Sequence, residues 1–351
     1  MIDYLVVGLG LAGISFCETL ETNGKTFKVL SDTSQQASVV AGGLYNPVIL
    51  KRFTLAWRAE EQLTVALPFY LALEHKLKTS LDYKLRVLRR FASIEEQNMW
   101  FEAADHPGLQ PFLSTKLVKN TNPHIDAPLG YGEVLHTGRI DTKALIQHYH
   151  QYLKERNLLF ETSFEYNQLA IEDSFISYKD IQAKQLVFAT GFGLQQNPYF
   201  NYLPLNGTKG ELLTIKAPLL KEQQVIKSSV FIIPLGDDLY RIGATYKWQD
   251  KTNLPTEAAK SELLVKLAAF MKCDYEVLHH VAGIRPTVAD RRPLVGQHPE
   301  YKNLFILNGF GSRGVMIAPY ASQALFNAVE NGIDLPKDMD IVRFNKRYKR
   351  N

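Results

Sequence analysis

The stretch Tyr4–Gly13, which reads Y-L-V-V-G-L-G-L-A-G, constrains the fold more than any other part of this sequence. Its first four residues form an apolar run typical of a buried parallel strand, and the glycines that follow have the spacing G-x-G-x-x-G. Gly8 allows a tight turn, Gly10 lets the backbone approach a pyrophosphate, and Gly13 lets a helix lie against the strand. The free N–H groups at the start of that helix would bind the phosphate.

The residues that follow fit a dinucleotide site. We expect a helix over Ile14–Glu21 and a second strand over Thr26–Leu30, which ends at Ser31 and Asp32. Asp32 lies nineteen residues after Gly13, and an acidic residue at about this distance accepts hydrogen bonds from an adenosine ribose. A glycine-rich turn that binds no nucleotide is the alternative, and the second strand with its acid disfavours it.

Composition narrows the class of protein. A chain of 351 residues exceeds what one core fills comfortably, so we expect two domains. The net charge of +4 neither excludes an acidic substrate nor argues for nucleic acid. Cys17 and Cys273 cannot form a disulfide framework, which fits a cytoplasmic protein. The apolar run Leu5–Phe16 is too short to span a membrane and lacks a basic leader, so we expect no membrane or targeting segment.

The rest of the chain first alternates helix and strand patterns and then, from about residue 205, has the pattern of an antiparallel sheet. We expect a helix over Leu55–Thr79, a strand over Tyr83–Phe91 with a solvated basic face, and irregular structure over Asn98–Leu135. Asp141 should cap a helix that runs to Arg156. Short strands are expected at Leu158–Thr162, Gln168–Ile171, Phe175–Tyr178 and Gln185–Phe188.

Residues 205–281 predict an antiparallel sheet with a helix over Thr256–Met271. The chain then returns with a buried strand, Leu304–Leu307, and a glycine-rich loop, Asn308–Gly314. That loop opens a helix that reaches about Glu330, so it forms a second helix N-terminus suited to an anion. A nicotinamide-dependent dehydrogenase would not need this second site.

Two further small-residue turns suit a flat cofactor. Ala41-Gly42-Gly43 would let the backbone press against a ring system, although a plain loop is the alternative, and Ala189-Thr190-Gly191 closes a strand where a cofactor could pass. The histidine pairs His148/His150 and His279/His280 point to different sides, so we predict no metal site.

These motifs, with Gly138–Asp141, Gly207–Glu211, Gly243–Thr245 and Gly283–Pro286, occur in an order that resembles the D-amino-acid oxidase and glycine oxidase family. The resemblance covers essentially the whole chain. Ala41–Pro47 and Gly311–Gly314 followed by Ala318-Pro319 look most like the flavin domain of the bifunctional enzymes that modify the tRNA wobble uridine.

The resemblance implies FAD and an α/β fold, α+β overall, in which a Rossmann-like FAD-binding domain is interleaved with an antiparallel-sheet substrate domain. The expected FAD-binding domain comprises residues 1–80, 138–204 and 282–351, and the substrate domain comprises residues 81–137 and 205–281. The cofactor-binding residues implied are Gly8, Gly10, Leu11, Ala12, Gly13, Ser31, Asp32, Ala41, Gly42, Gly43, Leu44, Phe164, Thr190, Gly191, Arg285, Gly309, Gly311, Ser312, Arg313, Gly314 and Val315.

For catalysis, the resemblance assigns Arg285 to grip a substrate carboxylate, with a structural salt bridge at a domain seam as the alternative. Tyr246 and Tyr240 are loose matches to the family's lid and substrate tyrosines. The family usually has a glutamate directly after the second strand, where this chain has Ser31, so either Ser31 or Asp32 holds the ribose.

The implied activity is oxidation of the C–N bond of an amine or amino acid, by hydride transfer to flavin N5, imine hydrolysis and flavin reoxidation. One alternative is removal of the carboxymethyl group from carboxymethylaminomethyl-uridine in tRNA, and another is a flavin-binding protein without turnover. The basic residues at the C-terminus suit a solvated tail better than a tRNA-binding site; they are Arg343, Lys346, Arg347, Lys349 and Arg350. The sequence leaves the electron acceptor and the oligomeric state open.

Overall fold

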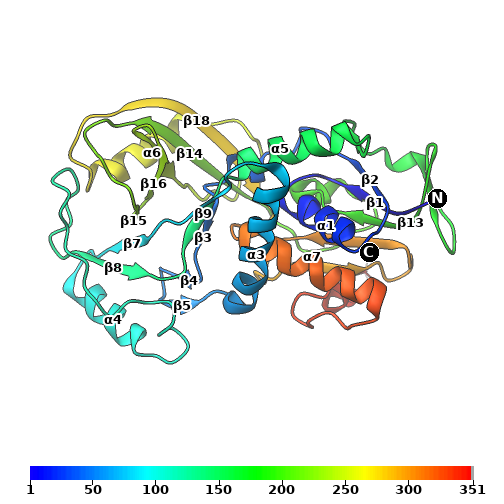
Figure 1. Ribbon diagram of the computed structural model, residues 1–351, viewed down its shortest axis with the longest axis horizontal. Coiled ribbons are helices and arrows are strands. Elements are labelled where there is room, and N and C mark those ends of the chain that lie inside the picture. Colours follow the sequence, from blue (N-terminus) through cyan, green and yellow to red (C-terminus); the bar gives the residue numbers. More distant parts are fainter. Residues whose placement is uncertain (349–351) are drawn as a thin grey trace.

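The computed structural model describes residues 1–348 and has two lobes, each built around one sheet (Figure 1). Lys349 and Arg350 of the basic C-terminal cluster lie outside the described residues. The predicted α/β fold class is confirmed, because a mainly parallel sheet and a mainly antiparallel sheet occupy separate lobes.

The first lobe contains an eight-stranded sheet with the order β10-β2-β1-β13-β12-β11, in which β20 pairs with β13 and β19 pairs with β20. Its strands are β1 (Ile2–Val7), β2 (Phe27–Leu30), β10 (Leu159–Phe160), β11 (Leu169–Ile171), β12 (Ile176–Tyr178), β13 (Ile181–Phe188), β19 (Leu294–Gln297) and β20 (Leu304–Asn308). Strands β10, β2, β1, β13 and β20 run parallel, so their carboxyl ends meet at one edge. Ligands of such sheets bind at this edge.

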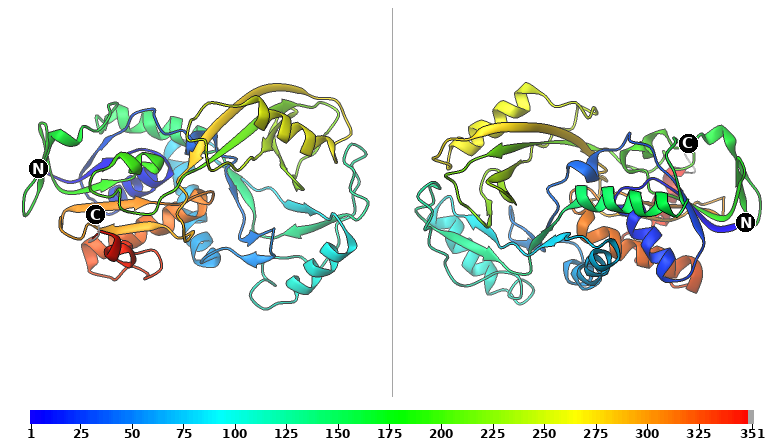
Figure 2. Two further views of the ribbon diagram at one scale, coloured as in Figure 1. Left: turned by 180° about the vertical axis from the view of Figure 1, so that it is seen from behind. Right: turned by 45° about the horizontal axis from the view of Figure 1, so that its top comes forward.

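Helices cover this sheet (Figures 1 and 2). They are α1 (Leu11–Thr22), α5 (Thr142–Glu155) and α7 (Gly314–Asn331). Outside this layer lie α3 (Ala59–Leu77), which packs on α5 and α7, and the short helices α2 (Ala37–Val40) and α8 (Asn345–Tyr348). Helix α7 packs on both α1 and α3. The predicted cap is confirmed, because Asp141 accepts a hydrogen bond from the Ala144 amide at the start of α5.

The second lobe contains a seven-stranded sheet with the order β18-β14-β17-β16-β15-β7-β8. Its elements are β7 (Val87–Arg90), α4 (Ile94–Ala104), β8 (Tyr131–Val134), β14 (Thr208–Lys216), β15 (Val225–Lys227), β16 (Phe231–Gly236), β17 (Leu239–Gly243), α6 (Glu257–Ala268) and β18 (Glu276–Arg285). All neighbours are antiparallel except β15 and β7. One face packs on α6 around Leu213, Ile242 and Leu263.

Two small sheets and three 3-10 helices complete the structure. The small sheets are β3 (Leu44–Tyr45) with β9 (Gly138–Ile140) and β6 (Asp82–Tyr83), and β4 (Val48–Ile49) with β5 (Thr54–Leu55). The 3-10 helices are η1 (Tyr166–Gln168), η2 (Gly191–Gln196) and η3 (Ile341–Phe344). The division into two interleaved domains remains a proposal, and the segments that build the two large sheets support it.

Two local predictions are wrong. The expected strand over Tyr83–Phe91 is two strands in different sheets, because β6 pairs with β9 whereas β7 pairs with β8 and β15. The region expected to be irregular contains α4, which extends to Ala104. Ser93 caps this helix by accepting a hydrogen bond from the Glu96 amide, so the S-x-x-E pattern of a capping box marks its start.

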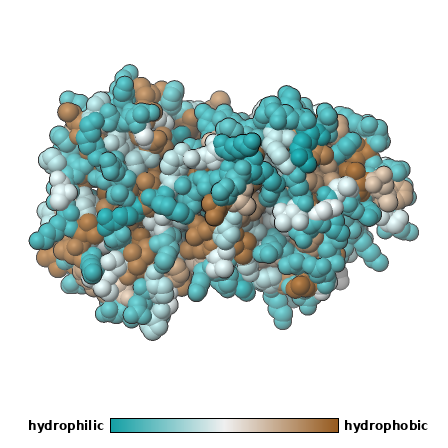
Figure 3. All heavy atoms as spheres, in the orientation of Figure 1, coloured by the Kyte–Doolittle hydropathy of each residue, from teal (hydrophilic) through white to brown (hydrophobic). Residues whose placement is uncertain are grey.

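Hydrophilic residues predominate on the face shown in Figure 3, where hydrophobic atoms form separate small patches. Within residues 1–348, no helix has the length and apolarity needed to cross a membrane. The apolar run Leu5–Phe16 instead forms the end of β1, the glycine turn and the first half of α1.

Candidate FAD and substrate site

The turn between β1 and α1 is closely packed and depends on two of its glycines. Gly8 has a φ of +100°, and a Cβ on it would lie 2.5 Å from the Ala189 carbonyl oxygen. A Cβ on Gly13 would lie 2.0 Å from the Gly8 carbonyl oxygen. Neither distance is compatible with a side chain, so the glycines allow the helix and the strand β13 to approach the turn. A Cβ on Gly10 would lie 3.1 Å from Ser38 Oγ.

A cavity of about 690 Å³ opens at this edge of the parallel sheet and extends to the second lobe. This volume is within the usual range for ligand sites. Most of the predicted site residues line it, namely Gly8, Gly10, Leu11, Ala12, Ser31, Asp32, Ala41, Gly42, Gly43, Leu44, Phe164, Thr190, Gly191, Arg285, Gly311, Ser312, Gly314 and Val315.

Three predicted cofactor residues lie behind the cavity wall. Gly13 packs against the turn, and a Cβ on Gly309 would lie 2.6 Å from Val288 Cγ2. Arg313 Nη1 donates a hydrogen bond to the Asn46 carbonyl, at 2.9 Å. These residues support the shape of the cavity and do not form its surface.

The N-termini of α1 and α7 converge on the cavity. A Cβ on Gly314 would lie 3.2 Å from Leu11 Cδ1, so the first residues of the two helices are close neighbours. Each helix N-terminus carries a partial positive charge. The arrangement therefore offers two positive helix ends to an anionic ligand, as the glycine-rich loops of the sequence predict.

Ser38 contributes to the site in a way that the sequence did not indicate. Its Oγ accepts a hydrogen bond of 3.2 Å from the Leu11 amide, the first residue of α1, and the residue lines the cavity. Ser38 is near in sequence to Ala41-Gly42-Gly43, but only the folded chain brings it to the glycine turn. The Thr190 Oγ1 atom, also at the cavity wall, is buried and has no hydrogen-bond partner within residues 1–348.

Ser31 and Asp32 both line the cavity, so the geometry does not choose between the two residues predicted to hold a ribose. Asp32 accepts hydrogen bonds from the Ser34 amide at 3.1 Å and from the Ser163 hydroxyl at 2.7 Å. Burial acts to raise the pKa of the Asp32 carboxyl, but the hydrogen bonds from Ser163 and Ser34 outweigh it and lower the pKa. The carboxylate is therefore ionised at neutral pH and able to accept further hydrogen bonds.

Arg285, at the end of β18, reaches the cavity from the side of the second lobe. Its guanidinium lies against the backbone of Gly210, and Nη1 donates a 3.3 Å hydrogen bond to the Thr245 carbonyl. Burial lowers the pKa of the guanidinium. Within residues 1–348, no carboxylate pairs with Arg285, which removes the salt bridge expected under the alternative interpretation.

The two tyrosines differ in location. Tyr240 is buried in the core beneath the second sheet, where its hydroxyl accepts a hydrogen bond from the Glu222 amide, so its assignment to the substrate site is wrong. Tyr246 is 43% exposed, and its ring centroid lies 5.3 Å from Arg285 Cζ. Burial acts to raise the pKa of Tyr246, but the hydrogen bond from Arg291 and its charge lower the pKa overall.

Within residues 1–348, neither the potential metal ligands nor the buried cysteine Cys17 indicates a further reactive site. In the part of the chain that the structure describes, no three His, Cys, Asp or Glu side chains are placed so that they could hold a metal ion. Cys17 is fully buried, and burial raises the pKa of its thiol, so it packs as a small apolar side chain.

Comparison with known families identifies the chain. The model of the family described as FAD dependent oxidoreductase matches residues 3–328. The chain belongs to the FAD-dependent oxidoreductase family. The predictions of this family and of FAD as the cofactor are thereby confirmed.

Individual relatives share limited sequence identity with this chain, over less than half of its length. The tRNA 5-methylaminomethyl-2-thiouridine biosynthesis bifunctional protein of Legionella pneumophila (strain Corby) is 26% identical over 191 residues, which cover 44% of this chain and 28% of that protein. The glycine oxidase of Geobacillus kaustophilus (strain HTA426) is 31% identical over 127 residues, which cover 35% of this chain and 33% of that protein. The matched stretches thus span a third or less of each relative.

Solved structures establish the fold of the family member along nearly its whole length. The structure resembles glycine oxidase from Bacillus cereus ATCC 14579 with a TM-score of 0.77 and 18% identity, covering 95% of this chain and 96% of that one. It resembles L-proline dehydrogenase from P. horikoshii with a TM-score of 0.76 and 16% identity, covering 98% of both chains.

The residues present are compatible with FAD. Gly8 and Gly10 carry no Cβ in the turn that precedes α1, and a second helix N-terminus faces the same cavity. These are the features that a long, flat cofactor with a pyrophosphate requires.

Proposed function

We propose that this oxidoreductase oxidises the C–N bond of an amine or amino acid that carries a carboxylate, and that Arg285 binds this carboxylate. The observation that carries the proposal is a partly buried guanidinium at the cavity wall for which residues 1–348 provide no carboxylate. Buried charges in proteins are normally paired, so a ligand carboxylate is the natural partner. Arginine provides two parallel donors for it.

We assign the cofactor as the resemblance implies. Gly8–Gly13 would hold the pyrophosphate, and Ser31 or Asp32 the adenosine ribose. Ala41–Leu44 would face the ring system, whose pyrimidine end the N-terminus of α7 would stabilise. When bound, FAD supplies the acceptor for the hydride that leaves the carbon next to the substrate nitrogen.

The chain's own contribution is mainly orientation. Around Arg285, the cavity is lined by Gly210, Leu212, Gly243 and Gly283, which cannot transfer protons. Arg285 fixes one end of the substrate, while Phe231 and Ile233 supply an apolar surface that excludes water. Positioning of this kind accounts for large rate enhancements without acid–base groups.

The decisive experiment mixes the FAD-loaded protein with single amines and amino acids in the absence of oxygen. We expect loss of the flavin absorbance with at least one carboxylate-bearing amine, followed by its return when an electron acceptor is added. An unchanged spectrum with the full set of amino acids and with tRNA would instead support the alternative of a flavin-binding protein without turnover.

A tRNA-borne amine is the second candidate, because the first relatives described above act in tRNA 5-methylaminomethyl-2-thiouridine biosynthesis. An exposed aromatic pair supports it. Trp248 is 39% exposed, its ring lies 5.5 Å from that of Tyr246, and Arg291 Cζ lies 5.3 Å above it. Such a surface suits stacking of a nucleic-acid base.

The cytoplasmic location that the cysteine content suggests remains a prediction, and it is compatible with either substrate.

A further inference from the structure

Strand β14 carries a pair of buried charges directly behind the proposed carboxylate site. Gly210 faces the cavity beneath the Arg285 guanidinium, and because side chains alternate along a strand, its neighbours Lys209 and Glu211 face the other way. Lys209 is 0% exposed and Glu211 is 1% exposed. Charged side chains are almost never buried so completely unless they are paired.

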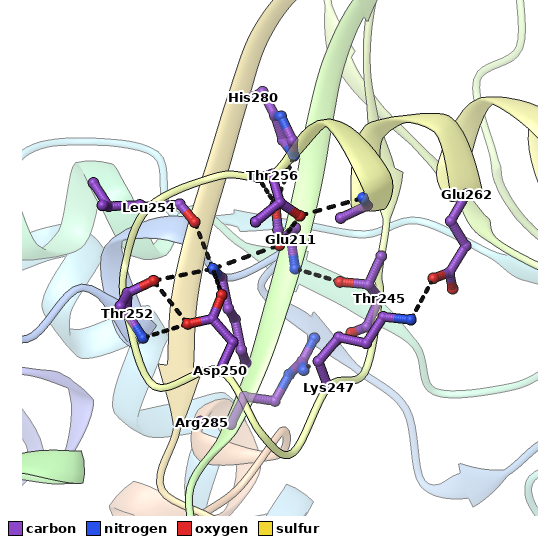
Figure 4. A network of polar contacts seen from close by, with 12 residues as sticks. Glu211, Thr245, Lys247, Asp250, Thr252, Leu254, Thr256, Glu262, His280 and Arg285 are labelled. Carbon is purple, nitrogen blue, oxygen red and sulfur yellow. Dashed lines mark hydrogen bonds and ion pairs between the residues drawn. The ribbon is translucent and has the colours of Figure 1, made fainter.

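Both side chains hold the segment between β17 and α6, which we call the 245–256 segment. Lys209 Nζ contacts the Asp250 carboxylate and the Leu254 carbonyl, and it lies 3.6 Å from the Glu211 carboxylate. Glu211 accepts hydrogen bonds from the Thr256 amide at 2.7 Å and from its hydroxyl at 3.0 Å. Figure 4 shows Glu211 beside Thr256, with Asp250 and Leu254 of the same segment close by.

His280 completes the group. Its Nε2 atom lies 3.0 Å from Glu211 Oε2, from the neighbouring strand β18. The same strand ends at Arg285, so β14 and β18 carry the proposed substrate ligand on one face and the buried charges on the other.

The near end of the 245–256 segment contacts Arg285. The Thr245 hydroxyl accepts a 2.9 Å hydrogen bond from the Glu211 amide, while the Thr245 carbonyl accepts the hydrogen bond from Arg285. Tyr246 then lays its ring beside the same guanidinium. The segment therefore supplies two of the contacts that fix Arg285. Its near end is also held by the backbone of β14, because Lys209 and Lys247 exchange backbone hydrogen bonds of 2.9 and 3.0 Å, whereas the rest of the segment depends on side-chain contacts.

We propose that Lys209 and Glu211 are positioning residues for substrate binding: by anchoring the 245–256 segment, they hold Thr245 and Tyr246 against Arg285. The inference rests on the proposed role of Arg285. Without these side-chain contacts, the segment would keep its backbone bridge at Lys247 and the hydrogen bonds of Lys251 to the Asn206 and Gly207 carbonyls, but its part from Asp250 to Thr256 would lose most of its attachment to β14. A less restrained segment samples more conformations and so holds Thr245 and Tyr246 less firmly beside Arg285. Buried ion pairs are often replaceable by apolar residues without loss of stability, so their use here is better explained by the geometry that they impose.

The test measures binding of acetate and of its uncharged analogue acetamide to the FAD-loaded protein, from the change in the flavin spectrum. The main variant is the double substitution Lys209→Met/Glu211→Gln, which removes both charges together. We expect it to retain FAD and to weaken acetate binding about tenfold, with a much smaller change for acetamide. Loss of general stability would shift both ligands alike, so the ratio of the two affinities isolates the effect on Arg285.

Two further variants complete the set. Asp250→Asn removes the carboxylate that pairs with Lys209 and should weaken acetate binding about threefold. This variant tests the inference even if the double variant does not fold. Lys247→Met is the matched control, because Lys247 belongs to the same segment but pairs with Glu262 on the surface, at 2.8 Å. It should bind acetate as the wild type does.

Arg285→Lys, measured in parallel, separates this inference from the proposed function. If Arg285→Lys binds acetate as tightly as the wild type, the role of Arg285 is wrong and the inference falls with it. If Arg285→Lys weakens binding but Asp250→Asn and any folded double variant do not, only the positioning role is overturned.

Discussion

The guanidinium of Arg285 rests directly on the Cα of Gly210, so closely that a Cβ there would lie 2.0 Å from Nη2 and 2.2 Å from Cζ. Nη1 of Arg285 would lie 2.3 Å from the same Cβ, so Nη1, Nη2 and Cζ are nearly equidistant from it. Gly210 is paired with Gly283 on β18, so two glycines face each other beside the arginine. The absence of side chains at this position defines where the guanidinium can lie.

Gly210→Ala should therefore displace Arg285 while the cofactor site is unaffected. We expect FAD to be retained and the dissociation constant of a carboxylate ligand to rise about tenfold, as for loss of one charge-assisted hydrogen bond. Titration of the flavin spectrum with acetate measures this. Gly108→Ala is the control, because a Cβ on Gly108 would make only ordinary contacts of 3.8 and 3.9 Å. Wild-type affinity in Gly210→Ala would contradict the assigned geometry.

Gly10→Val should abolish FAD retention. The valine side chain would project from the turn between β1 and α1 into the space that the pyrophosphate needs, where the structure has only Ser38 nearby. The ratio of flavin to protein after purification measures the effect, and Gly108→Val serves as the folding control. A folded Gly10→Val protein with one FAD per chain would disprove the pyrophosphate assignment.

Arg285→Lys keeps the positive charge but loses the planar pair of donors. We expect the apparent dissociation constant of the substrate to rise tenfold or more, if one charge-assisted bond worth about 1.5–3 kcal/mol is lost. Steady-state rates at low substrate concentration report it directly. Equal rates for the wild type and the variant would rule out carboxylate binding by Arg285.

The parts of the site that depend on local sequence could be predicted, whereas contacts between distant segments could not. The glycine turn is local, because Gly8 and Gly13 contact one another across a single strand–helix junction. The contact between Arg285 and Gly210 depends on the register of β14 against β18, which no spacing within either strand encodes. Ser38 was missed for the same reason, since it meets Leu11 only after the chain folds back.

Tyr240 shows a different limit. Tyrosine suits both a substrate pocket and a core with one polar contact, and the residue type does not distinguish these. The strand β17 alternates, and Tyr240 falls on the face that packs on α6 with Ile242. In contrast, the start of α4 could have been recognised, because Ser93 and Glu96 have the spacing of a capping box.

The stability of the protein should depend on pH through Lys227. Burial, with nearby Arg89 and Lys266, lowers the pKa of Lys227 from 10.5 to about 8. Above pH 8 the unfolded chain binds a proton that the folded protein does not, so this residue's contribution to the free energy of unfolding rises with pH. Relative to Lys227→Met, the wild type should gain on the order of 1–2 kcal/mol between pH 8 and pH 10, because one pKa unit corresponds to about 1.4 kcal/mol.

Urea unfolding of both proteins at the two pH values, with saturating FAD, measures this difference. The comparison with Lys227→Met removes the contributions of the tyrosines, which titrate equally in both proteins. A difference in unfolding free energy that does not change with pH would mean that Lys227 titrates as an exposed lysine.

The dependence of binding on salt should distinguish a free substrate from one carried on tRNA. Each phosphate contact releases counterions, so tRNA affinity should fall steeply as salt rises, whereas a carboxylate held by Arg285 in a partly buried cavity should respond weakly. Within the C-terminal cluster, Arg343 is already paired with Asp290 at 2.9 Å, so this residue is not part of a solvated tail. Trp248 and Arg291 are the better candidates for tRNA contacts.

We therefore expect that tRNA binding to the FAD-loaded protein, if it occurs, is weakened about tenfold in Trp248→Ala, since stacking of a base on an aromatic ring contributes about 1–3 kcal/mol. Trp248→Ala should leave acetate binding unchanged, because Thr245 and Tyr246 make the contacts to Arg285. Gel-shift titrations at about 50 and 200 mM salt measure both effects. Undetectable tRNA binding at the lower salt concentration would eliminate the tRNA alternative.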